Sequence, residues 1–454
     1  MALMVREKRF YRTFASMTGV IAMQNLITFA VNLADNVMIG GYSQTALSGV
    51  SIVNQIQFLL QMLMLGTGSA IGVLGAQYWG KKELEPIRKA TSSGVLLGVI
   101  LSTGMLLTVF FFPHQVMGLL TNEQAVIEEG SKYLVIVCFS YVLFAISNNL
   151  LSALRAVETV KIGFIVNLIA LVVNITLNYG LIYGRLGMPE LGVEGAAIAT
   201  LSARVVEFLV VVIYVLCIDK KICWRLKSLM SVDKAMFSDF INVGLPLILA
   251  NGIWGIAMSV QTAILGRLGE DTIAANSIAT TIFQVVSVVT YAASTASGVI
   301  IGITVGEGDI PRVKAYTKTM QILFLCIGVV TGLTLYACTD LIISLYDVTP
   351  AAAELARQFI LVLSFSVVGT SYQCSCLTGI VTGGGDTKFV LINDLIHQWL
   401  IVIPAAFLSA FVFHGPMWVT FACLKADQIL KCFVAVIKVN RYRWIRVLTR
   451  ENTN

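Results

Sequence analysis

Long apolar runs restrict this chain to one class of structure. Of its 454 residues, 57% are hydrophobic and only 12% are charged, whereas soluble domains average about 45–50% apolar and about 25% charged residues. Each run is long enough to cross a bilayer as a helix and too continuous to be a barrel strand. The sequence therefore predicts an all-α integral membrane protein with twelve transmembrane helices. The runs lie near residues 16–40, 45–76, 90–112, 131–154, 162–184, 193–218, 239–266, 272–305, 316–341, 354–381, 388–412 and 416–439.

The placement of Lys and Arg predicts the orientation of these helices. The formal charge is +6, and the basic residues gather in both terminal regions and in every second loop. Because cytoplasmic loops carry the excess of Lys and Arg, an even number of spans with both ends in the cytoplasm is expected, in a plasma or inner membrane. This placement also argues against a nucleic-acid partner. The opposite side holds only Lys132, Arg185, Arg267 and Arg357.

A weak internal repeat predicts how the helices are grouped. A shift of 226 positions pairs Gly40 with Gly266 and Ser51 with Ser277, which aligns helix 1 with helix 7. Six spans per repeat predict two lobes related by a pseudo-two-fold axis along the membrane normal, with a cavity between them. The predicted parts are an N-terminal lobe at 1–218, a cytoplasmic linker at 219–238 and a C-terminal lobe at 239–454.

Asp35 is the first candidate functional residue, since it lies about five residues from the far end of the first apolar run. An aspartate at the centre of a membrane helix costs about 2.5–3.5 kcal/mol, so such residues usually face a cavity within the protein. The alternative is that Asp35 only caps the outer turn or bonds to neighbouring backbone.

Asn174 and Asn178 are candidates to act with that carboxylate. They are four residues apart, so they share a helix face and can direct their amide oxygens at one point. A site made only of oxygens suits sodium, and burial of a carboxyl group favours the protonated form instead. The sequence leaves Na+ and H+ both open. Hydrogen bonds that merely join helices are the competing explanation for both asparagines.

Four stretches resemble the multidrug and toxic compound extrusion (MATE) family: LADNVMIGGYSQTALSGVSI, SALRAVETVKIGFIVNLIALVVNITLNYGLIYG, LGVEGAAIAT and GLPLILANGIWGIAMSVQTAILGRLG. The resemblance covers nearly the whole chain. It implies an antiporter, driven by Na+ or H+, that exports amphipathic and often cationic organic compounds by alternating access between two six-helix lobes. It implies neither an enzyme nor a cofactor, and it implies a monomer whose partners are small organic substrates and the lipid bilayer.

The resemblance also implies a cation or proton site in the N-terminal lobe. The family's helix-1 acid falls on Asp35, its helix-5 positions fall on Asn174 and Asn178, and its helix-6 hydroxyl falls on Thr200. No metal other than Na+ at this site is expected. The positions where some members carry a second acidic site hold Trp254 and Ser371, so that second site is predicted to be absent.

Other intramembrane polar residues have weaker claims. Gln261 takes the place of Asp35 in the second lobe, and Arg204 and Glu207 are spaced to neutralise one another. Asp394 and His397 have the same spacing and are a possible proton relay. Each polar candidate for the substrate cavity competes with a purely structural role. These candidates are Gln24, Asn25, Asn32, Gln55, Gln61, Trp254, Gln261, Asn276, Gln284, Tyr291 and Tyr372.

The sequence is also compatible with two other functions. A flippase for lipid-linked sugars has a related fold, but it would need a strongly cationic cavity, and intramembrane Lys and Arg are few here. A channel or receptor without coupled transport also accounts for twelve helices. Enzymatic activity finds no support, since no nucleophile, base and orienting residue can be recognised together.

Overall fold

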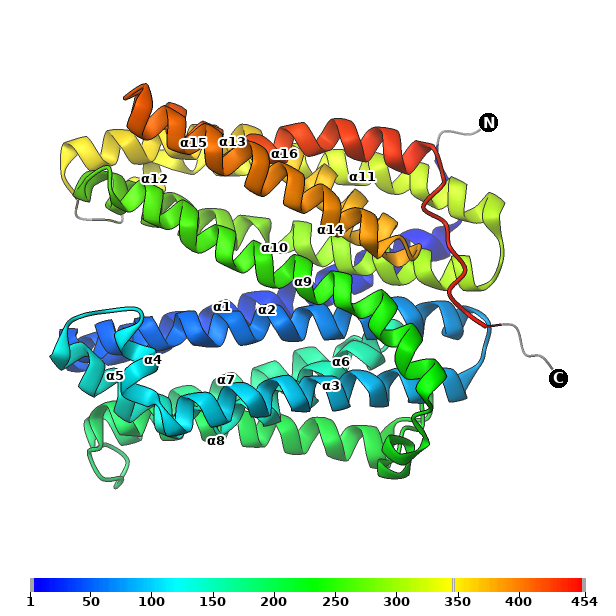
Figure 1. Ribbon diagram of the computed structural model, residues 1–454, viewed down its shortest axis with the longest axis horizontal. Helices are drawn as coiled ribbons and strands as arrows, with labels where there is room; N and C mark the ends of the chain where they lie inside the picture. Colours follow the sequence, from blue (N-terminus) through cyan, green and yellow to red (C-terminus); the bar gives the residue numbers. More distant parts are fainter. Residues whose placement is uncertain (1–3, 345, 347, 451–454) are drawn as a thin grey trace. The chain divides into compact units, whose positions relative to one another are not determined.

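The computed structural model describes residues 4–344, 346 and 348–450, and it is helical throughout with no strand in those ranges (Figure 1). This confirms the predicted all-α membrane fold. Helices are the expected solution, because each one satisfies its own backbone hydrogen bonds where water is absent.

Twelve long helical segments among the described residues follow the twelve predicted apolar runs in order. The first six segments are α1 (Lys8–Tyr42), α2 (Gln44–Gly80), α3 (Leu84–Phe111), the pair α5 (Gln124–Val137) and α6 (Ser140–Ala156), α7 (Lys161–Tyr183), and α8 (Gly192–Ile213) with η1 (Tyr214–Ile218). The next four are α9 (Lys234–Gly266), α10 (Glu270–Gly306), α11 (Ile310–Ala337), and α13 (Pro350–Cys374) with η3 (Ser375–Val381). The eleventh is the succession α14 (Thr387–Leu395), η4 (Ile396–Val402), α15 (Ile403–Phe407) and η5 (Leu408–Val412), and the twelfth is α16 (Met417–Asn440). Short helices occur at α4 (Pro113–Gly118), η2 (Leu226–Ser231) and α12 (Thr339–Ile343).

Most of these segments qualify as membrane spans by length and composition. Ten single segments do so within the described residues, and the pair α5 and α6, bent by 52°, forms an eleventh. The remaining long helix is α16, which covers the last predicted apolar run. It contains four charged residues, namely Lys425, Asp427, Lys431 and Lys438.

The helices divide into two compact units. Unit 1 contains the described parts of Met1–Ala22, Ala76–Lys82 and Leu249–Asn454, and unit 2 contains Met23–Gly75 and Glu83–Ile248. Helices α1, α2 and α9 contribute to both. The lobe boundaries expected from the repeat remain a prediction.

Each unit has its own packed interior. In unit 1, Phe359 of α13 and Phe421 of α16 stack with ring centroids 4.1 Å apart. In unit 2, Asn149 of α6 accepts a hydrogen bond from Thr67 of α2 at 2.9 Å and donates one to the carbonyl of Gly94 in α3 at 3.2 Å. Such bonds between helices satisfy polar groups that neither water nor lipid can reach.

A close backbone contact in unit 1 depends on glycine. A Cβ atom on Gly306, at the end of α10, would lie 1.9 Å from the carbonyl oxygen of Gln77 in α2, and one on Gly80 would lie 2.1 Å from the carbonyl oxygen of Ile303. Small residues allow membrane helices to approach this closely. Any side chain at Gly306 must push the two helices apart.

We therefore expect Gly306→Ala to lower the stability of the solubilised protein by about 1–3 kcal/mol, the usual cost of forcing atoms into a packed contact. Thermal unfolding in detergent measures this effect. Gly104→Ala is the matched control, because a Cβ atom there meets nothing within 4 Å. An unchanged melting temperature for Gly306→Ala would contradict the contact.

The residues after α16, here called the C-terminal strap (441–450), lie against unit 1. Trp444 is fully buried, and its indole nitrogen donates to the carbonyl of Val439 at 2.9 Å. Arg446 contacts Asp386 at 3.0 Å, and the backbone nitrogen of Leu448 donates to the side chain of Gln77 at 2.8 Å. The strap is thus held by both apolar and polar contacts.

Candidate functional site

Asp35 lies on α1 beside two buried asparagines of α7. The amide nitrogen of Asn178 donates to Asp35 Oδ1 and also to Asn174 Oδ1, the latter at 3.2 Å. Asn174 is 1% exposed and Asn178 is 0% exposed. The spacing of four residues on α7 therefore places both amides on one face, next to the carboxylate.

Asp35 and Asn174 border a hollow in unit 2 with a volume of about 680 Å³, which includes the open solvent at its mouth. Its wall combines a carboxylate, amides, hydroxyls and one ion pair, and α1, α2, α5, α7 and α8 all contribute to it. Its polar side includes Asp35, Tyr133, Asn174, Thr200, Arg204 and Glu207.

Thr200 of α8, which the family resemblance assigned to the cation site, also lines the hollow. Its hydroxyl lies 3.4 Å from that of Tyr133 on α5. Asp35, Asn174 and Thr200 all line the hollow, and Asn178 is attached to the first two by hydrogen bonds. The structure thus brings together the four residues of the predicted cation site.

Two buried polar atoms at this site lack a hydrogen-bond partner among the described residues: Asn178 Oδ1 and Asn174 Nδ2. An unpartnered buried polar group costs about 1–3 kcal/mol, so such groups are usually satisfied by something that binds there. The free oxygen of Asn178 is a ligand suited to a hard cation.

Arg204 and Glu207 form the ion pair expected from their spacing, with Nη1 2.6 Å from Oε2. The guanidinium also lies over the ring of Phe144, 4.8 Å from its centroid. Arg204 is the one cationic side chain among the described residues of the wall. The guanidinium of Arg204 is paired with Glu207. The carboxylate of Asp35 accepts a hydrogen bond from the amide of Asn178.

Sequence reasoning missed several residues of this wall. Tyr133, Asn54, Gln57 and Asn167 line it, and Arg204 and Glu207 were expected only to neutralise each other. Their positions on separate helices give no sequence spacing that relates them to Asp35. The polar character of Asn54 and Gln57 within an apolar run was the available signal.

The predicted cavity residues scatter over the molecule. Asn32 lines the hollow with Asp35, whereas Trp254 lines a different, smaller pocket in unit 1. Gln24 is buried against Gly163 of α7, and Gln261 is buried within unit 1. Asn276 accepts a hydrogen bond from Thr280, and Tyr372 donates one to Gln321. The remaining candidates are exposed or half-buried: Asn25, Gln55, Gln61, Gln284 and Tyr291.

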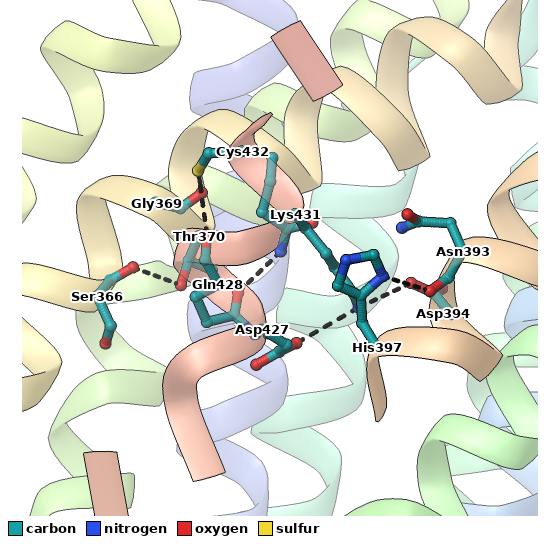
Figure 2. A network of polar contacts seen from close by, with 11 residues as sticks. Ser366, Gly369, Thr370, Asn393, Asp394, His397, Asp427, Gln428, Lys431 and Cys432 are labelled. Carbon is teal, nitrogen blue, oxygen red and sulfur yellow. Dashed lines mark hydrogen bonds and ion pairs between the residues drawn. The ribbon is translucent and has the colours of Figure 1, made fainter. Parts of the chain in front are cut away.

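Asp394 and His397 are not joined to each other by a hydrogen bond in the described part of the chain. Asp394 Oδ1 accepts from Lys431 of α16 at 2.8 Å, and His397 Nδ1 lies 2.8 Å from the carbonyl oxygen of Asn393 (Figure 2). The aspartate therefore has a partner that the i, i+3 spacing did not predict. The expected relay between the two residues remains a prediction.

Together the apolar spans and the half-buried carboxylate define a polytopic membrane protein with a polar site among its helices. Comparison with known proteins shows similarity to one family of proteins. The MatE family profile matches residues 21–180 and 246–408. The chain is 24% identical over 437 residues to a probable multidrug resistance protein NorM of Listeria monocytogenes, covering 95% of this chain and 94% of that protein. It is 27% identical over 393 residues to the NorM protein of Photorhabdus laumondii, covering 86% and 85%.

Solved structures agree in fold. A mutant of the Vibrio cholerae MATE transporter VcmN superposes with a TM-score of 0.88 at 16% identity, covering 97% of this chain and 99% of that one. The eukaryotic MATE transporter AtDTX14 gives 0.85 at 16% identity and 97% coverage of both chains. The chain belongs to the MATE family, whose members are membrane transporters and not enzymes.

Proposed function

We propose that this protein is a multidrug efflux antiporter of the plasma membrane. In this proposal Na+ or H+ moves inward and drives export of amphipathic, often cationic organic compounds by alternating access. The name of the NorM relatives, multidrug resistance protein, supports the substrate class. Both termini are placed in the cytoplasm on the basis of the Lys and Arg distribution. The protein is proposed to act as a monomer.

The observation that carries this proposal is a half-buried carboxylate that has no ion-pair partner among the described residues. Asp35 receives a hydrogen bond from Asn178, while Arg204 in the same wall is paired with Glu207. A charge inside the membrane is costly unless something compensates for it. An exchangeable Na+ or H+ at Asp35 supplies that compensation, with Asn174, Asn178 and Thr200 as additional oxygen donors for Na+.

Coupling follows if the cation and the organic substrate favour different states, or if they compete for one. A ligand changes a conformational equilibrium only by its difference in affinity for the two states. In the proposed cycle, occupancy of Asp35 by the coupling cation favours release of the substrate outside. The hollow beside Asp35, with Asn32 in its wall, is the proposed place where the two occupancies meet.

Efflux from proteoliposomes tests this proposal. The protein is reconstituted with a fluorescent organic cation inside, and a Na+ gradient or a pH gradient is imposed separately. Efflux that depends on one of these gradients supports antiport and identifies the coupling ion. Release that occurs equally without either gradient would exclude it.

Asn178→Leu tests the amide that bonds to Asp35. Leucine has a similar volume but removes both the donor to the carboxylate and the free oxygen, and a hydrogen bond to a charged group contributes about 1.5–3 kcal/mol. We expect the coupling-ion concentration for half-maximal efflux to change by about tenfold to a hundredfold.

Asn167→Leu is the control for this experiment. It makes the same substitution on the same helix, in the wall of the same hollow, at a residue that donates to Gln24 and Thr28. Equal ion dependence for Asn178→Leu and Asn167→Leu would contradict a specific role for Asn178.

A further inference from the structure

Three charged side chains line the hollow of unit 2, and together they set its charge. Asp35 lies on α1, while Arg204 and Glu207 lie on α8. Every other described residue of the wall is apolar or carries a neutral polar group. Two carboxylates and one guanidinium give the hollow a net charge of −1 when all three groups are ionised.

Helix α8 presents the ion pair on the same face as Thr200, the hydroxyl of the candidate cation site. Thr200, Arg204 and Glu207 follow at intervals of four and three residues, which is the spacing of one helix face. The side chain of Arg204 is 28% exposed and that of Glu207 is 5% exposed, so the guanidinium is the more accessible member of the pair. A ligand in the hollow therefore meets a negative charge at Asp35 and a positive charge at Arg204.

The ion pair contributes little to the stability of the helices. Desolvation of two buried charges offsets their attraction, and apolar residues of similar volume often stabilise a protein as well or better. Among the described residues, Arg204 donates one hydrogen bond, to Glu207, and its other N–H groups have no acceptor. An arginine held in this way influences its surroundings mainly through its charge.

We propose that Arg204 makes the hollow selective for organic compounds with a single positive charge. This inference rests on the proposed function, in which the hollow receives organic cations. A monocation neutralises the net charge of −1, whereas a dication leaves an uncompensated positive charge among membrane helices, where charges are costly. The second charge of a compact dication also comes near the guanidinium, and like charges placed close together oppose binding.

The same charges make the coupling ion and the organic compound exclude one another. One Na+ or H+ at Asp35 already brings the net charge of the hollow to zero. A monocationic compound that entered as well would add an excess positive charge. The two ligands therefore compete for one negative charge, and competition of this kind allows one gradient to drive the other.

Two compounds of matched shape test the proposal on the purified protein. The para-phenyl derivative of N-methylpyridinium carries one positive charge, and methyl viologen carries two on nearly the same pair of linked aromatic rings. Equilibrium dialysis with the labelled compounds gives the Kd of each. Like charges about 10 Å apart, at an effective dielectric constant of about 20, weaken binding by about tenfold or more. The wild type should therefore bind the monocation about tenfold more tightly than the dication.

Three variants change the charge of the hollow in steps, and each is measured at about pH 8.5 to keep carboxylates ionised. Arg204→Gln changes the net charge to −2 and should abolish or reverse the preference for the monocation. Glu207→Gln changes it to zero, so both compounds should bind more weakly and the dication should lose the most. The double variant Arg204→Gln/Glu207→Gln restores −1 and should restore the wild-type preference. A purely structural arginine would instead make the double variant behave like Arg204→Gln.

Lys132→Gln is the control for the loss of a positive charge. Lys132 is paired with Glu129 at the same i, i+3 spacing, but this pair lies outside the wall of the hollow. The variant should show the wild-type preference. If Arg204→Gln does not fold, Glu207→Gln and the double variant still decide the matter, because neither leaves a buried carboxylate without its counter-charge.

An equal preference in the wild type, Arg204→Gln and Glu207→Gln would overturn the proposal, and so would equal binding of the two compounds by the wild type. Saturable binding of neither compound would reject the hollow as a substrate site and this inference with it. Gradient-driven efflux from proteoliposomes separates the two questions. Its absence in the wild type would reject antiport, while the binding preference would still decide on Arg204.

Discussion

Asp35→Asn is expected to abolish gradient-driven efflux while the protein stays folded and inserted in the membrane. Asparagine has nearly the same volume and still accepts the hydrogen bond from Asn178. It carries no negative charge and takes up no proton, so neither Na+ nor H+ binds there with useful affinity. Because an equilibrium shifts only through differential binding, the gradient then drives nothing. Accumulation of a fluorescent cation in everted vesicles should fall to the level of vesicles without the protein.

Two comparisons make this result specific. Asp35→Asn should melt at or above the wild-type temperature, because it removes the burial of a charge. Asp340→Asn, on the exposed carboxylate paired with Arg357, should retain full efflux. Efflux that persists in Asp35→Asn at the wild-type rate would refute the central role of this residue, whatever its surroundings.

The helices themselves were predictable because the membrane leaves little choice. A run of about twenty apolar residues has to satisfy its backbone internally, so length and hydropathy locate the spans. Details that depend on tertiary packing were not predictable. The 52° bend between α5 and α6 falls near Cys138 and Phe139, where neither proline nor glycine marks it. The π-helices η4 and η5 flank Pro404, and a proline indicates an irregular helix without specifying π-helical turns.

The candidate site was predictable where its residues share one helix or a family motif. Asn174 and Asn178 lie one turn apart, so their common face follows from helix geometry. The contact with Asp35 depended on the family resemblance, because 143 residues separate Asn178 from it. Lys431 is separated from Asp394 by 37 residues, and the nearer His397 was chosen instead. Sequence spacing identifies neighbours along a helix and not across helices.

The C-terminal strap provides the second large effect that we expect. Trp444 is buried against Gly384, where an added Cβ atom would come within 2.2 Å of the indole ring. Truncation of a buried tryptophan to alanine typically costs about 3–5 kcal/mol. The other anchors of the strap are mostly polar. Arg446 contacts Asp386, its backbone nitrogen donates to the carbonyl of Gly384 at 2.8 Å, and its carbonyl accepts from Gln77 at 3.2 Å. The backbone nitrogens of Leu448 and Arg450 donate to the side chains of Gln77 and Tyr78. A hydrogen bond within a protein contributes a net of about 0.5–1.5 kcal/mol, so the loss of Trp444 outweighs several of these contacts together.

Trp444→Ala should therefore release the strap without unfolding the membrane helices, because a segment held by local contacts opens at a lower free energy than the whole protein. Arg441, Arg443 and Arg446 lie within the strap and become trypsin sites when it opens. At the low end of that range, about 3 kcal/mol, the rate of tryptic cleavage there should rise about a hundredfold.

Trp418→Ala is the matched control, because Trp418 begins the same helix α16 but is 46% exposed. Its strap should be cleaved at the wild-type rate. If Trp444→Ala is also cleaved at that rate, the polar contacts alone hold the strap, and Asp386 with its two cations, Lys438 and Arg446, becomes the anchor instead. If Trp444→Ala melts as a whole, the strap belongs to the cooperative core of unit 1, and its release does not occur separately from unfolding.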